Sequence, residues 1–176
     1  MSNLASEHSN PPWREDGELE ALTFDIAGET FALEAAIVRE ILDLLPETAV
    51  PGARAFVGSV VNFRGKVIPL ADIRLAFGMP SAEVTIDSRI VVVEVDIEGT
   101  PTLVGLRTDK VTEVLTLKKS DSEPPPRVGM RWPTELIECL IKRGSSVIIF
   151  PDLKAIFAAN SRKPAAEAEV IRHPKS

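Results

Sequence analysis

Histidine and cysteine are almost absent from this sequence of 176 residues. The two histidines, His8 and His173, lie near its ends, and Cys139 is the only cysteine. A central region without histidine excludes Ser-His-Asp and Cys-His catalytic sites there, and also the usual zinc site built on histidine. A single cysteine excludes a disulfide within the chain and a thiolate metal cluster, which fits a reducing compartment. We therefore expect neither a metal nor a cofactor.

Excess positive charge and long apolar runs are also lacking. The formal net charge is −6 and the pI is about 5.1, which argues against nucleic-acid binding, because such proteins usually carry a basic stripe. The longest apolar runs, such as residues 90–93 and 147–151, are too short to span a bilayer, and the N-terminus does not resemble a secretory signal. These absences predict a cytoplasmic protein without direct membrane insertion and without a nucleic-acid partner.

Short apolar runs separated by turns fill the middle of the chain. Tyrosine is absent and aromatic residues make up 5%, whereas 44% of residues are hydrophobic, so we expect a core of valine, isoleucine and leucine. Strands are predicted at 22–26, 30–33, 38–44, 57–63, 66–70, 89–95, 102–107, 111–117 and 146–150, and short helices at 73–77 and 153–157. Many short strands with little helix indicate a barrel or a sandwich.

The polar ends of the chain differ from this pattern. Residues 1–17 and 161–176 have no apolar periodicity, so we expect two flexible tails. Residues 18–160 then form a single folded domain.

An internal repeat runs through that domain. The segment "VREILDL" at 38–44 matches "VTEVLTL" at 111–117, and "RGKVIPLADIRLAF" at 64–77 matches "RGSSVIIFPDLKAIF" at 143–157. The matches occur in the same order, which predicts two similar small β-barrels.

Two acids occupy equivalent positions in this repeat. Asp72 and Asp152 each stand directly before a predicted short helix. A carboxylate at such a position accepts hydrogen bonds from the free N–H groups of the first turn. We therefore expect both acids to act as structural caps.

The repeat also relates a second pair of charged positions. Glu40 corresponds to Glu113, and Arg64 corresponds to Arg143. We expect an acid–arginine contact between neighbouring strands in each half.

The segment "NFRGKVIPLADIR" at 62–74 leaves three interpretations open: a catalytic acid, a ligand clamp, or a structural corner beside a partner surface. Arg64-Gly65 reads as a tight hairpin turn, since glycine tolerates positive φ, and Asn62 fits the same turn. Asp72 has no second acid or histidine at motif spacing beside it, which disfavours catalysis.

The same segment closely resembles the N-L-R-G-x-V-x-P-x-x-D-L-R signature of CheW-like domains, the coupling module of bacterial chemotaxis. The segments "LTFDIAGETFALEAAIVREIL", "RIVVVEV", "VGLRTDKVTEVL" and "VIIFPDLKAIF" follow the order of the family, so the resemblance covers roughly residues 18–158. It implies a mostly β fold of two packed five-stranded SH3-like barrels, and no enzymatic activity.

The resemblance also implies partners. Such proteins bridge the cytoplasmic tips of methyl-accepting chemoreceptors and a CheA-type histidine kinase, in arrays on the inner face of the membrane. The receptor contact in this family lies in an apolar groove between the barrels.

Eight residues are candidates for binding these partners: Val38, Glu40, Ile41, Val61, Asn62, Phe63, Arg64 and Gly65. Val38, Ile41 and Val61 suit the apolar groove, although a core position is the simpler explanation for them. Arg64 either contacts a partner or only pairs with Glu40.

Three other functions stay open. A CheW-like scaffold could serve a non-flagellar chemosensory pathway, such as surface motility or second-messenger control. A nucleic-acid-binding barrel is disfavoured by the acidic pI and the few aromatic residues. A carboxylate-based hydrolase would need two acids that converge in a pocket.

Overall fold

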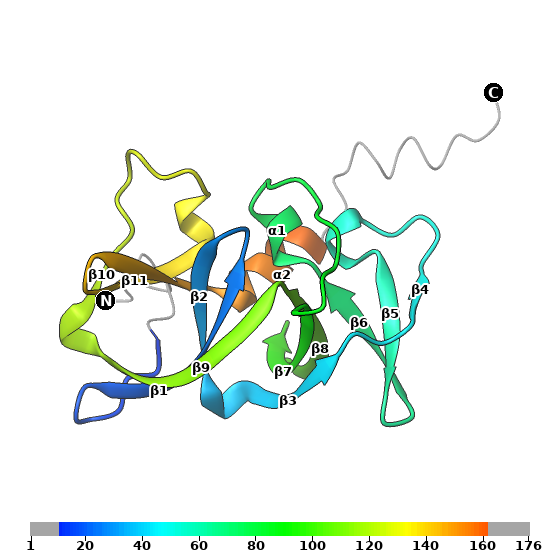
Figure 1. Cartoon of the computed structure of the whole chain (residues 1–176), viewed down its shortest axis with the longest axis horizontal. Coiled ribbons are helices and arrows are strands. Elements are labelled where there is room, and N and C mark those ends of the chain that lie inside the picture. The colour runs from blue at the N-terminus through cyan, green and yellow to red at the C-terminus, as the bar shows by residue number, and fades with distance from the viewer. Residues whose placement is uncertain (1–10, 162–176) are drawn as a thin grey trace.

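The computed structural model describes residues 11–161 of the chain (Figure 1). Its strands are β1 (Glu18–Ile26), β2 (Glu29–Glu34), β3 (Val38–Asp43), β4 (Glu47–Ala49), β5 (Ser59–Phe63), β6 (Lys66–Ala71), β7 (Arg89–Ile97), β8 (Thr100–Thr108), β9 (Lys110–Lys118), β10 (Ser122–Glu123), β11 (Ile137–Arg143) and β12 (Ser146–Pro151). Its α-helices are α1 (Ile73–Ala76) and α2 (Leu153–Ser161), and short 3₁₀-helices are η2 (Ala35–Ile37), η3 (Ala55–Val57), η4 (Lys119–Asp121) and η5 (Thr134–Leu136).

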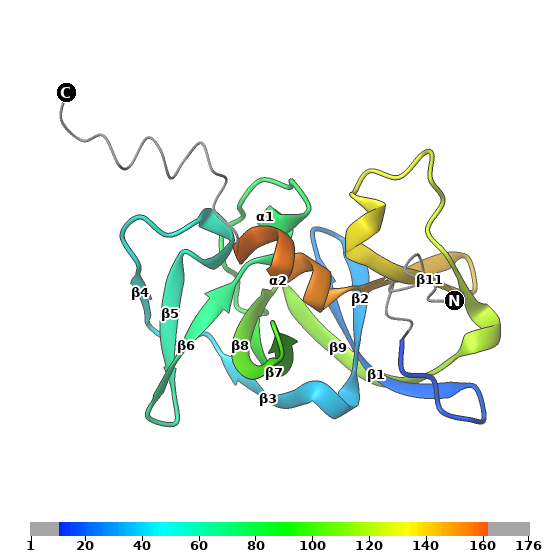
Figure 2. The same ribbon diagram turned by 180° about the vertical axis from the view of Figure 1, so that it is seen from behind.

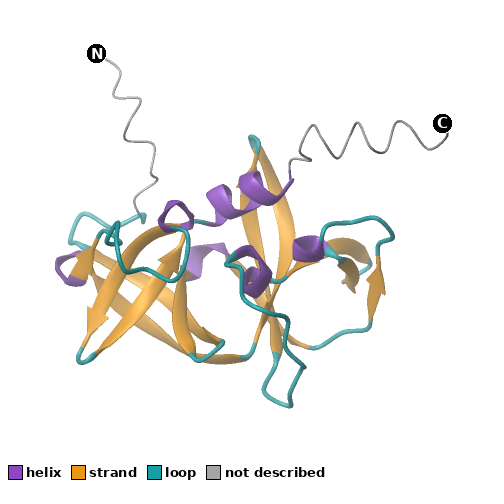
Figure 3. Cartoon of the chain, turned by 90° about the horizontal axis from the view of Figure 1, so that it is seen from above, coloured by secondary structure: helices purple, strands orange, loops and turns teal. Residues whose placement is uncertain are grey.

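The strands form two curled sheets of six strands each (Figure 3). The first sheet, barrel I, has the order β10-β11-β12-β2-β1-β9, and the second, barrel II, has the order β3-β7-β8-β6-β5-β4. Each barrel consists of five strands of at least five residues and one very short strand, β10 or β4. The mostly β, double-barrel fold class predicted from the sequence is confirmed.

The two barrels do not coincide with the two copies of the repeat. Strands β1 and β2 belong to the first copy but lie in barrel I with β9 to β12, while β7 and β8 of the second copy lie in barrel II. Each exchanged hairpin joins its new sheet on both sides. The parallel pairs are β12 with β2 and β6 with β8, and the antiparallel pairs are β1 with β9 and β3 with β7. Each copy therefore gives its first hairpin to the other barrel, and the chain crosses between barrels at η2 and again at the β8–β9 turn.

One core spans both barrels. It contains Leu22 and Phe31 from barrel I together with Val91 and Leu106 from barrel II, all at most 4% exposed. The expectation of a core without aromatic residues was wrong, because all seven phenylalanines are buried. A phenylalanine side chain buries more apolar area than an aliphatic one, so a few suffice to fill the contact between two small barrels.

The ends of the domain are defined by packing. The expected N-terminal tail, residues 1–17, lies partly outside the described residues, and in its described part Trp13 packs against a core cluster of barrel I. The expected C-terminal tail, residues 161–176, also lies outside them except for Ser161, which ends α2. Both α-helices lie at the junction of the barrels, and Figure 2 shows α2 in front there. No helix between residues 11 and 161 is both long and apolar enough to cross a bilayer.

Candidate functional site

The motif at 62–74 begins with the hairpin that joins β5 and β6. Arg64 and Gly65 form its turn with φ angles of 52° and 80°. Glycine adopts this left-handed region without strain, and Asn62 Oδ1 accepts a hydrogen bond from Gly65 N at 2.9 Å. Asn62 and Gly65 thus set the shape of the turn and fix where Arg64 stands.

Arg64 projects from this turn and pairs with Glu40 of β3. The Arg64 side chain is 72% exposed and its guanidinium lies 5.4 Å from the centre of the Phe63 ring, whereas Glu40 is 29% exposed. A cation over an aromatic ring gains about 0.5–1 kcal/mol at an exposed site. Two contacts therefore hold an arginine that still faces solvent.

The repeat produces a second acid–arginine pair, as expected from the sequence. Arg143 at the end of β11 lies 4.0 Å from Glu113 of β9. The expectation that these contacts join neighbouring strands was wrong, because β3 and β5 are not adjacent in barrel II, nor are β9 and β11 in barrel I. The curl of each sheet brings strands together that share no hydrogen bonds.

The other candidate residues divide by exposure. Ile41 is 42% exposed, and Val38 is half-buried against the main core. Val61 and Phe63 are 2% and 9% exposed and pack in a core cluster of barrel II. Direct partner contact by Val61 is therefore excluded by its burial, which reflects the inward face of β5. The sequence reading overlooked Val67 of β6, which is 64% exposed just beyond the turn.

Asp72 and Asp152 occupy equivalent helix starts. Asp72 Oδ1 accepts a hydrogen bond from Arg74 N at 3.1 Å, and Asp152 Oδ1 accepts one from Ala155 N at 3.0 Å. Burial raises the pKa of Asp72 above its ordinary value, although Arg107 and Arg74 act in the opposite direction. The carboxylates satisfy backbone donors, which is what a capping residue does.

Arg74, the last residue of the motif, forms an ion pair that the sequence reading missed. Its Nη1 and Nη2 donate to the two carboxylate oxygens of Asp109, at 3.0 and 2.6 Å. The Arg74 side chain is 8% exposed and that of Asp109 is 35% exposed. We call this bidentate pair the clasp. The only feature of the sequence that pointed to the clasp was Arg74 at the end of the motif.

The clasp connects the two barrels. Asp109 lies where the chain crosses from β8 to β9, and it also accepts a hydrogen bond from Ala27 N of the β1–β2 turn at 2.8 Å. Burial alone would raise the pKa of Asp109, but the hydrogen bonds from Arg74 and from Ala27 outweigh it, so the pKa lies below its ordinary value. The clasp thus ties α1 and barrel II to barrel I.

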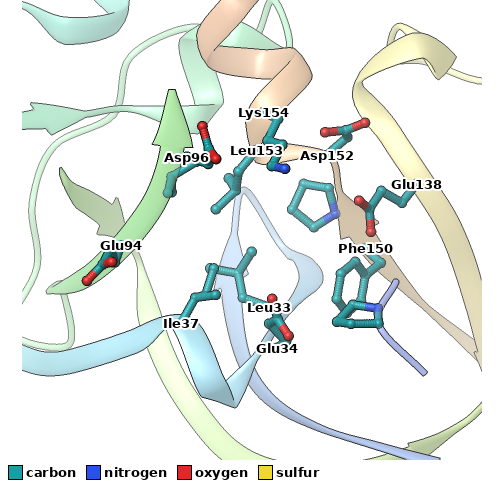
Figure 4. A pocket seen from close by; sticks show the side chains of 13 residues that line it. Leu33, Glu34, Ile37, Glu94, Asp96, Glu138, Phe150, Asp152, Leu153 and Lys154 are labelled. Atoms are coloured by element: carbon teal, nitrogen blue, oxygen red, sulfur yellow. The ribbon is translucent and has the colours of Figure 1, made fainter. Parts of the chain in front are cut away.

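A groove of about 250 Å³ lies between the barrels on the side of α2 (Figure 4). Its lining consists of Pro12, Leu33, Glu34, Ile37, Glu94, Val95, Asp96, Glu138, Phe150, Pro151, Asp152, Leu153 and Lys154. We call it the inter-barrel groove. Val38, Ile41 and Val61, the residues expected in a groove between the barrels, do not line it. Within residues 11–161, no group of acidic, histidine or cysteine side chains could hold a metal ion.

The family model described as "CheW-like domain" matches residues 20–161, which is most of the chain. This chain belongs to the CheW-like domain family.

Similar proteins come from several bacteria. "Chemotaxis protein CheW" of Rhizobium meliloti (strain 1021) is 29% identical over 94% of this chain and 100% of its own length. The protein of the same name from Bacillus subtilis (strain 168) is 29% identical over 82% of this chain and 90% of its own. The crystal structure of the scaffolding protein TtCheW from Thermoanaerobacter tengcongensis superimposes with a TM-score of 0.72, at 31% identity, over 83% of this chain and 97% of that one.

In this CheW-like chain the motif at 62–74 has two structural tasks. Its first four residues build a turn that presents an arginine to solvent, and its last residues cap α1 and form the clasp. Of the three interpretations left open by the sequence, the described contacts match a structural corner, because every motif carboxylate and guanidinium already has a partner within the chain.

Proposed function

We propose that this CheW-like chain is a non-enzymatic adaptor that couples chemoreceptors to a CheA-type histidine kinase in bacterial chemotaxis or a related chemosensory pathway. Relatives named "Chemotaxis protein CheW" and a solved "scaffolding protein" of the same fold support this proposal. Such an adaptor works in the cytoplasm, at receptor arrays on the inner face of the membrane.

The observation that carries the proposal is the preorganised Arg64 on the rim of barrel II. Arginine is enriched among residues that dominate protein interfaces, and binding costs less entropy when the side chain is already held in place. Arg64 is held by Glu40 and Phe63 while most of its surface stays in solvent. Ile41 and Val67 add exposed apolar area on the same barrel.

The exposure of each candidate side chain decides its proposed role on the surface around Arg64. Arg64, Glu40 and Ile41 are the residues that a partner would contact, with Val38 at its edge. Asn62 and Gly65 would act through the shape of the turn, and buried Phe63 through its support of the guanidinium. This assignment gives three of the eight candidate residues a supporting role.

The test is recruitment of the chain to membranes that contain the native receptor and the kinase. Arg64→Ala is expected to weaken co-sedimentation by at least about tenfold, equivalent to about 1.4 kcal/mol. The free energy of unfolding should change by less than about 1 kcal/mol, because exposed ion pairs contribute little.

Arg14→Ala is the matched control, since Arg14 forms an exposed pair with Glu18 at 3.4 Å on the N-terminal turn. This variant should be recruited normally. Normal recruitment of Arg64→Ala, or an equal loss in both variants, would contradict the assignment of this surface. The receptor and kinase that co-purify from the native host identify the pathway.

A further inference from the structure

A second groove lies at one end of barrel II, beside the last turn of α2, where the described part of the chain ends. It has a volume of about 470 Å³ and is lined by Val50, Pro51, Gly52, Ala53, Arg54, Val57 and Asn160. We call it the η3 groove, because most of its lining comes from the loop between β4 and β5 that contains η3. Figure 2 shows this loop next to the end of α2. None of these residues lines the inter-barrel groove, so the two grooves are separate.

The two walls of the η3 groove are fixed by contacts within the chain. Val50 N donates a hydrogen bond to Gly58 O at 2.9 Å, and Ala53 N donates one to Val50 O at 3.1 Å, which holds the loop in shape. Phe56 of η3 packs edge-on against Phe157 of α2, with ring centres 5.2 Å apart, and both rings are buried. The groove is therefore preformed, which lowers the entropy cost of binding there.

The lining of the η3 groove is mainly apolar. Val50 is 40% exposed, although valine is usually buried, and Pro51, Ala53 and Val57 add further apolar surface. Arg54 is the only ionisable residue of the lining, and it already interacts with other groups of the chain, so we assign it no part in binding. An apolar side chain is therefore the occupant that gains most from this groove.

The chain itself continues from the edge of the η3 groove. Asn160 lines the groove, Ser161 ends α2, and residues 162–176 follow directly. Pro164 lacks an N–H and disfavours helical backbone at the residue before it, so we expect the chain to leave the axis of α2 there. A continuous helix would carry the chain away from the groove, whereas a break at Pro164 lets it turn back.

The segment that begins at Pro164 contains one pair of large apolar residues. It reads "PAAEAEVIRHPKS", and Val170 and Ile171 are its only residues of this kind. Ile171 is ten residues beyond Ser161, and an unstructured chain of that length has an average end-to-end distance of about 18 Å. Because Ser161 follows a residue of the lining, the apolar pair can reach every wall of the η3 groove.

We propose that Val170 and Ile171 dock in the η3 groove of the same molecule. The contact removes exposed apolar surface on both sides. The short tether gives the segment an effective concentration in the millimolar range, so that even a weak contact is populated. A second copy would have to bind without this advantage and against the repulsion between two molecules that each carry a net charge of −6.

This contact does not depend on the proposed adaptor function. The η3 groove lies before Ser59 at the start of β5, whereas the Arg64 turn follows Phe63 at the other end of that strand. The surface around Arg64 therefore stays accessible when the groove is filled. The two proposals can fail separately, since Arg64→Ala should leave docking in the η3 groove unchanged.

The test compares full-length chains labelled with ¹⁵N. The double variant replaces Val170 and Ile171 by serine. In it the amide signals of Val50 and Ala53 should shift, because the apolar side chains that cover them are lost. Ile86→Ser is the matched control, since Ile86 is 90% exposed in the loop before β7 and lies outside the groove, and it should leave these signals in place.

A change on the groove side tests the same contact in reverse. A synthetic peptide of residues 162–176 gives the amide signals of Val170 and Ile171 in the undocked state. In the full chain these signals should differ from those of the peptide, and Val50→Ser should move them toward the peptide values. The hydrogen bonds of Val50 are made by its backbone and survive the change, so this variant should keep its fold.

Three results would overturn the proposal. The first is unchanged signals of Val50 and Ala53 in the double variant, or equal shifts in the control. The second is identical signals of Val170 and Ile171 in the chain and in the peptide. The third is a dependence on protein concentration: docking within one molecule predicts none, and shifts that vanish on dilution would assign the groove to a second copy.

Discussion

The clasp gives an asymmetric prediction for its two partners. Asp109→Asn removes the carboxylate that the Arg74 guanidinium contacts directly, in a position where the arginine side chain is only 8% exposed, and leaves Asp72 as a nearby acid. Breaking a fully buried pair in this way costs about 3–5 kcal/mol. Because Asp109 is 35% exposed and asparagine still accepts a hydrogen bond, we expect a loss near the lower end, about 3 kcal/mol. The source of this cost is a buried cation that has lost its bidentate partner.

Arg74→Met should be milder although it breaks the same contact. Methionine fills most of the volume of the arginine stem, and the Asp109 carboxylate that remains can be solvated and keeps its hydrogen bond from Ala27 N. We expect a loss of about 1 kcal/mol, typical of a partly exposed pair. The double variant should resemble Arg74→Met, so that the two changes are strongly non-additive.

Urea unfolding followed by tryptophan fluorescence measures these differences. Trp132 stacks on Phe77, next to α1, with ring centres 6.1 Å apart, so it reports on the junction. The exposed pair of Arg14 and Glu18 is the control, and Glu18→Gln should cost less than about 0.5 kcal/mol. Equal losses for Asp109→Asn and Arg74→Met, or losses below about 0.5 kcal/mol for both, would refute the account of a buried cation that needs its acid.

Three further predictions concern pH, a helix cap and the cysteine. The pKa of Asp109 is lowered in the folded state, so its contribution to stability is present above the unfolded pKa of about 3.9 and is lost as the pH falls through the folded pKa. The urea midpoint should therefore drop more steeply in acid for the native chain than for Asp109→Asn. Parallel curves of urea midpoint against pH would argue against this linkage. Asp152→Ala removes the side-chain cap of α2 and should lower the free energy of unfolding by about 1 kcal/mol, whereas an unchanged urea midpoint would show that the cap is dispensable. Burial raises the pKa of Cys139 to about 12, so a thiol reagent at pH 8 should label the chain only after unfolding, and rapid labelling of the folded chain would contradict the burial.

Local and repeated features could be predicted from the sequence. The alternation at 22–26 lies within β1, and the run at 89–95 lies within β7. The correspondence of Glu40 with Glu113 and of Arg64 with Arg143 predicted two ion pairs that the structure contains. Each of these features depends on residues that are close in the chain or on a pattern that occurs twice.

Other features escaped the sequence because they depend on packing. Strand β11 was missed, since its burial follows no simple alternation: three consecutive residues, 139–141, are buried. Val61 was expected in the apolar groove, but its side chain faces the core. The alternation of residues in a strand separates its two faces, but it does not show which face points into a closed barrel. Candidate residues could be identified, but their exposure could not.

The sequence by itself determined the fold class, the internal repeat, the turn at Arg64-Gly65 and the family. The fold class and the repeat follow from the spacing of short segments along the chain, and the turn and the family follow from a motif of contiguous residues. Only the tertiary structure decided that the hairpins are exchanged between barrels, that Arg74 reaches Asp109, and that a groove lies between the barrels on the side of α2. The physical reason is that these three outcomes depend on which strand edges and charges meet in space. Strand pairing and charge contacts across distant segments are settled by the burial of a common core, which no local pattern encodes.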